Sequence, residues 1–117
     1  MAFKFENLKV WQNAVELSGQ VYELTETFPK KEMFVLTSQI QRASDSVALN
    51  IAEGSTGQTN PEFKRFLTYA NRSAIEVVSC LHLAKRRKLI DQIQFDHFYN
   101  YLTELIKSIQ ALRNSIK

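Results

Sequence analysis

The residues best suited to chemistry lie in the stretch RASDSVALNIAEG, residues 42–54. Its polar side chains recur three or four residues apart, a spacing that places them on one face of a helix. Residues 69–76 carry a second polar set at the same spacing. We call the two sets together the polar seam: Arg42, Ser46, Asn50, Glu53, Tyr69, Ser73 and Glu76. Carboxylates that face one another in such a seam can act as general acid and base.

Three interpretations of the polar seam are open: an active site, a lock that fixes helix register, or a solvated face. Neither segment contains a histidine or an activated nucleophile, so no catalytic residue is predicted. Half-buried charges need partners, and we expect Arg42 to face a carboxylate such as Glu76. Such pairs would fix the register of two neighbouring helices. The other residues expected to approach one another are Asn50, Glu53, Tyr69 and Glu62.

The histidines and the single cysteine do not form a metal or nucleophilic pattern. Neither His82 nor His97 has the Glu three residues earlier that di-iron bundles use. Cys80 lies between apolar neighbours, where a buried, inert thiol is expected. The loop GSTGQT lacks the Gly-Lys-Ser/Thr ending of a phosphate-binding loop. No metal and no cofactor are predicted.

Positive charge is concentrated in the second half of the chain. Residues 1–58 contain five Lys/Arg and seven Asp/Glu, whereas residues 59–117 contain ten and five. Clustered cations can release counterions from a nucleic-acid backbone, which predicts RNA or DNA binding. The alternative is that the last four only stabilise the carboxyl end of a helix. The candidate residues are Lys64, Arg65, Arg72, Lys85, Arg86, Arg87 and Lys88.

Four long segments position these residues, because apolar side chains recur in alternating steps of three and four. The predicted helices cover about residues 7–27, 31–53, 61–87 and 91–116. Short connections force successive helices to be neighbours, so the predicted fold is an all-α, antiparallel up-down-up-down four-helix bundle. With 117 residues, the chain is expected to form one domain, residues 1–117.

Local signals set the expected helix ends. Phe28-Pro29 should end the first helix, and Gly54 suits the left-handed residue that follows the second. Asn60 is the expected N-cap of the third helix, with Pro61 at its first position. Asp91 and Gln94 have the spacing of a capping box at the start of the fourth.

Composition indicates where the protein works. One cysteine rules out an internal disulfide, and the first residues are not a secretory signal. No apolar run approaches the roughly 20 residues that cross a bilayer. We therefore expect a soluble, cytoplasmic protein with no membrane contact.

Helices one and four carry more apolar residues than one small bundle can bury. The additional positions are Leu8, Trp11, Val15, Tyr22, Tyr99 and Ile106. Part of this wide apolar surface is expected to be an interface between subunits. Scattered exposed aromatics are the alternative.

Three segments carry a family resemblance: FENLKVWQNAVEL, TFPKKEMFVLTSQIQRASDSVALNIAEGS and EFKRFLTYANRSAIEV. They resemble the bacterial four-helix-bundle family first met as reading frames in intervening sequences of large-subunit rRNA genes. Members of that family resemble the accessory proteins of diversity-generating retroelements, which form pentameric bundles and bind a reverse transcriptase and nucleic acid.

The resemblance implies a homopentamer without known enzymatic activity, and as partners RNA or DNA and a reverse transcriptase or other protein. A protein-interaction scaffold without nucleic-acid binding is the alternative function. One departure is that the family usually has Gly-Ser where this chain has Arg72-Ser73, so an arginine replaces a residue that permits close helix approach.

Overall fold

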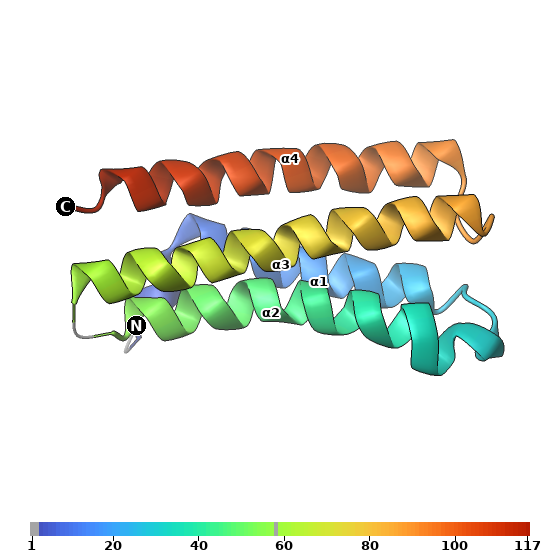
Figure 1. Ribbon diagram of the computed structural model, residues 1–117, viewed down its shortest axis with the longest axis horizontal. Helices are drawn as coiled ribbons and strands as arrows, with labels where there is room; N and C mark the ends of the chain where they lie inside the picture. The colour runs from blue at the N-terminus through green and yellow to red at the C-terminus, as the bar shows by residue number, and fades with distance from the viewer. Residues whose placement is uncertain (1–2, 58) are drawn as a thin grey trace.

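The computed structural model describes residues 3–57 and 59–117; Gln58 of the GSTGQT loop and the first two residues of the expected domain lie outside the described residues. Four long helices dominate the structure: α1 (Lys9–Thr25), α2 (Ser38–Ser55), α3 (Asn60–Arg86) and α4 (Gln92–Ser115). They run alternately up and down in a rod of 44 × 22 × 22 Å (Figure 1). The predicted all-α, up-down-up-down bundle is confirmed.

Each helix buries the face that its spacing predicts. The apolar positions of α1 from Val10 to Leu24 are buried, as are those of α3 from Phe63 to Ala84. In α4 the apolar positions from Phe95 to Ile109 are buried, and Leu112, near the end of the helix, is only partly buried. The helices pack around the core in chain order, α1 on α2, α2 on α3 and α3 on α4, and α4 also faces α1. None of the described helices is long and apolar enough to span a membrane.

Gly54 does not have the role that the sequence suggested. It is buried inside α2, which continues to Ser55, and no glycine among the described residues has a positive φ. A Cβ atom at Gly54 would lie 2.6 Å from Cβ of Phe66 and 3.1 Å from Cδ1 of Phe63. Gly54 therefore lets α2 and α3 approach closely where a methyl group would not fit.

The chain between α1 and α2 also differs from the prediction of one regular helix from residue 31. α1 ends at Thr25, and two short helices precede α2: the 3₁₀ helix η2 (Lys30–Glu32) and the π-helix η3 (Met33–Thr37). The Glu32 carboxylate accepts a hydrogen bond from the Leu36 amide at 3.4 Å and also binds Arg87. The contact between Glu32 and Arg87, 55 residues apart in sequence, stabilises the irregular segment before α2. Local apolar periodicity does not predict such a contact.

The caps of α3 and α4 were predicted with different success. The N-cap of α3 is Thr59 rather than Asn60, because the Thr59 hydroxyl accepts the Glu62 amide hydrogen at 3.2 Å. The capping box of α4 is confirmed: Asp91 accepts from the Gln94 amide at 2.8 Å, and the Gln94 side chain accepts from the Asp91 amide at 2.9 Å.

Substitution of two helical glycines by alanine tests the close contact of α2 with α3. Gly54→Ala should lower the free energy of unfolding by about 1–3 kcal/mol, since the added methyl overpacks against Phe66. Gly19→Ala is the matched control, because nothing lies within 4 Å of its Cβ and it is exposed in the middle of α1. It should raise stability by about 0.5–1 kcal/mol. Urea denaturation followed by circular dichroism measures both, and equal shifts would contradict the packing role of Gly54.

Candidate nucleic-acid interface

The centre of the polar seam is a small hydrogen-bonded cluster between α2 and α3. The Ser73 hydroxyl donates to the Ser46 hydroxyl at 3.0 Å. The Asn50 amide donates to the Ser46 hydroxyl at 2.9 Å and to the Ser46 carbonyl at 2.8 Å. All three side chains are partly buried. The Ser73–Ser46 bond joins the two helices at one register, and the Asn50 bonds orient Ser46 within α2. This arrangement agrees with the predicted lock; the role itself stays a prediction.

The outer residues of the polar seam are not paired as expected. Glu76 accepts a hydrogen bond from Gln39, and no ion pair joins it to Arg42 among residues 3–57 and 59–117. Arg42 and Glu53 are exposed. Glu53 does share a surface hollow with Glu62, whereas Tyr69 packs edge-on against Phe66 with ring centroids 5.5 Å apart. The seam therefore brings together hydroxyl and amide groups, and these do not form an acid–base pair.

The run Lys85–Lys88, which we call the basic cluster, ends α3 in an unusual way. Lys88 has φ 61°, the only positive value for a non-glycine among the described residues. The Leu89 amide donates to the Ala84 carbonyl at 2.9 Å, and the Lys88 amide to the Lys85 carbonyl at 3.0 Å. These two bonds define a Schellman motif, whose left-handed position normally holds glycine. A lysine there costs about 1 kcal/mol of backbone strain.

The four cations of the basic cluster have different surroundings. Arg87 forms an ion pair with Glu32 at 3.0 Å, across the bundle end from η2. Lys85 places its ammonium group 4.8 Å from the centre of the Phe95 ring. Arg86 and Lys88 are exposed and form no ion pair within the part of the chain that the structure describes. Lys85, Arg86, Lys88 and His82 line one hollow of about 400 Å³.

The other predicted cations lie elsewhere on α3. Lys64 and Arg65 are near its start, where Arg65 is 3.8 Å from Glu62. They share a second hollow of about 400 Å³ with Arg113 and Lys117 of the chain end, two cations that sequence reasoning missed. Arg72 is exposed on the middle of α3 and lines neither hollow. The seven candidates therefore do not form one site: six of them divide between the two ends of the bundle, and Arg72 lies between these two groups.

The remaining reactive side chains have structural partners. His82 contacts the rings of Phe95 and Tyr99, and His97 shares a hydrogen bond of 2.7 Å with Gln20. Burial, with a smaller contribution from Glu76, raises the pKa of Cys80 to about 11, so its thiol is protonated at neutral pH. No group of three or more potential metal ligands occurs among residues 3–57 and 59–117.

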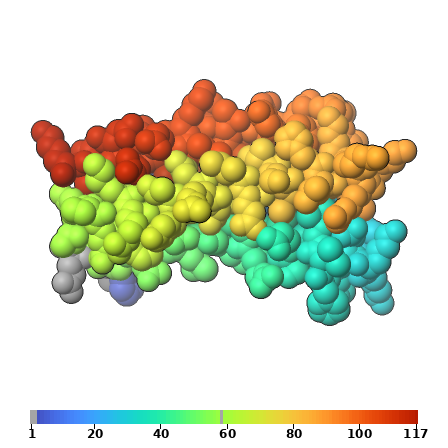
Figure 2. Space-filling model, viewed as in Figure 1, coloured from blue at the N-terminus to red at the C-terminus, as the bar shows by residue number. Residues whose placement is uncertain are grey.

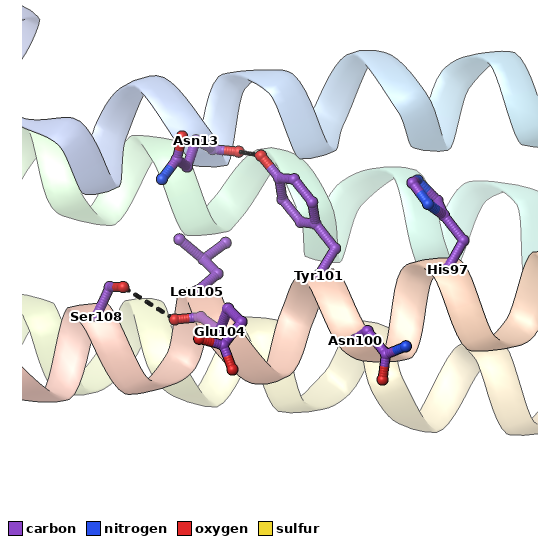
Figure 3. A pocket seen from close by; sticks show the side chains of 7 residues that line it. All are labelled: Asn13, His97, Asn100, Tyr101, Glu104, Leu105 and Ser108. Atoms are coloured by element: carbon purple, nitrogen blue, oxygen red, sulfur yellow. Dashed lines mark hydrogen bonds between the residues drawn. The ribbon is translucent and has the colours of Figure 1, made fainter.

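A hollow of about 390 Å³ between α1 and α4 is lined by both polar and apolar side chains (Figure 3). The Tyr101 hydroxyl donates to the Asn13 carbonyl at 2.7 Å, and partial burial raises the pKa of Tyr101. Ser108 donates to the Glu104 carbonyl at 2.9 Å. Both hydroxyl groups are thus engaged by backbone carbonyls. The Tyr101 bond links α4 to α1, whereas the Ser108 bond lies within α4.

The predicted wide apolar surface is only partly exposed. Leu8, Trp11 and Ile106 pack against the core, whereas Val15, Tyr22 and Tyr99 remain exposed. Val15 shares a hollow of about 280 Å³ between α1 and α2 with Trp11 and Leu49. The Tyr22 hydroxyl donates to Asp45 at 3.3 Å, and the nearby carboxylate is the main cause of the raised pKa of Tyr22.

Together, the fold and its charges define an all-α bundle protein with exposed cations at both ends of its longest helix. The chain belongs to the 23S rRNA-intervening sequence protein family, whose sequence profile matches residues 6–111. This membership confirms the family resemblance seen in the sequence.

The structure is also similar to that of a protein of unknown function from Bacteroides thetaiotaomicron VPI-5482, a member of the S23 ribosomal protein family. The two chains are 25% identical, with a TM-score of 0.84 over 91% of this chain and 96% of that chain. No curated protein is similar enough to be matched.

The Glu32–Arg87 pair can be tested by substitution. Glu32→Gln should lower the free energy of unfolding by about 1–2 kcal/mol, because Glu32 is buried and holds both Arg87 and the Leu36 amide, while the partly exposed Arg87 limits the effect. Glu26→Gln, an exposed carboxylate at the end of α1, is the control. Chemical denaturation of both variants, combined with Arg87→Gln in a double-mutant cycle, gives the coupling energy. A coupling near zero would show that the pair is incidental.

Proposed function

We propose that this protein is a non-enzymatic, homo-oligomeric nucleic-acid-binding protein that contacts RNA or DNA backbones through the basic cluster. The observation that carries the proposal is Lys88. A lysine occupies a left-handed position where glycine is free of strain, so its charge is kept against a cost in folding free energy. Strain of this kind is concentrated at functional sites.

The surroundings of the basic cluster support the same function. Arg86 and Lys88 are exposed, with no described carboxylate paired to either, so both are accessible to phosphate groups. Arg87 is held by Glu32 and fixes the position of the segment. Contacts of this kind read backbone charge and give affinity with little sequence preference.

Exposed apolar residues on opposite sides of the bundle favour a ring of subunits. One set lies in the α1/α2 groove with Val15 and Leu49, and another on the α3/α4 side with Tyr99 and Leu83. A contact between two different surfaces would be heterologous, and a heterologous contact forms a ring when the rotation between successive copies closes. A ring of five copies, as the family resemblance suggests, would repeat the basic cluster on one rim and multiply its affinity.

The proposed function predicts a variant that keeps its stability and binds nucleic acid less tightly. In the triple variant Lys85→Gln, Arg86→Gln, Lys88→Gly, relief of backbone strain should offset lost contacts, so the fold remains at least as stable. Binding of structured RNA at low salt should weaken at least tenfold, and the slope of log K against log salt should fall by about one for each lost phosphate contact. Fluorescence anisotropy across a salt series measures both.

The matched control for the basic cluster is the triple variant Lys9→Gln, Arg42→Gln, Lys107→Gln, which also removes three exposed positive charges, from α1, α2 and α4. This control should change RNA affinity little. Equal weakening in both variants would indicate a nonspecific effect of net charge. Unchanged RNA binding by the triple variant would refute the assignment and favour the scaffold function.

Assembly is tested by a charge in the α1/α2 groove. Leu49→Glu, at a side chain that is 66% exposed, should leave the monomer folded and abolish association, because the charge would be buried in the contact. Light scattering after size exclusion should give about five times 13.5 kDa for the unchanged protein and one chain mass for the variant. Gln110→Glu on the exposed face of α4 is the control. A monomeric unchanged protein would contradict the ring.

A further inference from the structure

The π-helix η3 presents an aromatic ring to solvent. Phe34 is 88% exposed, and its neighbours Met33 and Val35 are about half exposed, whereas Leu36 of the same segment is buried in the core. Phe34 makes none of the aromatic contacts found among the described rings. The ring is therefore held on a short, anchored segment with both faces accessible. A π-helical turn of this kind is frequent at functional sites.

The exposed ring lies at the same end of the bundle as the basic cluster. In Figure 1 the α1–α2 connection and the α3–α4 connection occupy one end, and Figure 2 shows their surfaces side by side there. The 3.0 Å Glu32–Arg87 ion pair joins the two connections directly. Glu32 ends η2 and also accepts the Leu36 amide of η3, so one carboxylate fixes the ring relative to the cations.

Cations surround this end of the molecule from both connections. Lys30 and Lys31 of η2 are exposed and, within residues 3–57 and 59–117, form no ion pair. The carboxylates at this end are fewer than the cations: Glu32 is bound to Arg87, Asp91 caps α4, and Glu26 is exposed at the end of α1. The end surface therefore combines a free ring with positive charge: Lys30, Lys31, Phe34, Lys85, Arg86 and Lys88.

We propose that this end surface binds unpaired nucleotides of RNA or DNA, with a base stacked on Phe34 and the flanking phosphates against the two groups of cations. The proposal rests on the proposed function and adds the kind of nucleic acid recognised. Charge complementarity requires an anionic occupant, and a flat, exposed ring fits a base that has a free face. Aromatic stacking beside cationic grooves is the general mode of single-strand binding.

Two other anionic occupants fit this surface less well. In a duplex the bases stack on one another, so Phe34 would have no base face to contact. A bilayer surface is bound in proportion to the apolar area inserted, and here that area is limited to the three side chains Met33–Val35 at a lysine-rich end. An unpaired strand uses both the ring and the charges.

The experiment compares one labelled RNA strand, free and annealed to its complement, by fluorescence anisotropy at low salt. Phe34→Ala should weaken binding of the free strand about tenfold and binding of the duplex by about twofold or less. Phe34→Leu, which keeps apolar area without a ring, should behave like Phe34→Ala, whereas Phe34→Trp should retain affinity. Val35→Ala is the matched control within η3 and should bind as the unchanged protein does.

Each of the other possible results shows whether the proposed function, the stacking surface or both are wrong. If the unchanged protein binds neither form in a salt-dependent way, the proposed function and this inference both fall. If both forms bind and Phe34→Ala changes neither, or weakens both equally, the function stands and the stacking surface is refuted. If Phe34→Ala instead abolishes binding to phosphatidylserine vesicles while RNA binding is unchanged, the occupant is a lipid surface. The high exposure of Phe34 keeps all variants folded, which circular dichroism checks.

Discussion

The rest of the structure depends on the close approach of α2 to α3. At Gly54 of α2 even a methyl group would collide with Phe66 of α3. Because the two backbones are so close, sliding α2 along α3 would bring large side chains into collision. Packing therefore permits few registers of the two helices. The hydrogen bond between Ser46 and Ser73 adds a directional contact at the same interface. Shape and polarity together therefore specify one alignment of the two helices.

That alignment decides where the functional groups lie. α3 has 27 residues, which corresponds to a rise of roughly 40 Å. Its cations are consequently too far apart to act on one ligand group, and each end gathers different neighbours. The start of α3 lies near Arg113 and Lys117, while its end lies near η2 and η3. Because α1 and α3 run parallel in an up-down-up-down bundle, the α1–α2 and α3–α4 connections must share one end. Topology alone thus places Phe34 at the same end of the bundle as the basic cluster.

The sequence predicted what depends on local periodicity and missed what depends on distant contacts. Apolar spacing identified the buried faces of all four helices, and the Asp91–Gln94 spacing identified a cap that forms within four residues. Gly54 was misinterpreted because a glycine near a helix end suits both a left-handed turn and a close contact, and only the position of Phe66 distinguishes them. The predicted pairing of Arg42 with Glu76 was wrong for a similar reason. Gln39 lies one helical turn before Arg42, and only the packed structure shows that Glu76 accepts its hydrogen bond from Gln39.

The same limit applies to the run Lys85–Lys88, where sequence reasoning gave four equivalent cations. In the structure Arg87 is bound to a buried carboxylate, Lys85 lies over the Phe95 ring, and Lys88 turns the chain through a left-handed residue. A favourable interaction with the helix dipole accounts for cations in the last turn, but it does not require a lysine at the position that favours glycine. The contacts of Arg87 and Lys85 anchor the segment to η2 and to α4. Arg86 and Lys88 are exposed on this anchored backbone, and in the proposed function such anchoring would lower the conformational entropy lost on binding a phosphate.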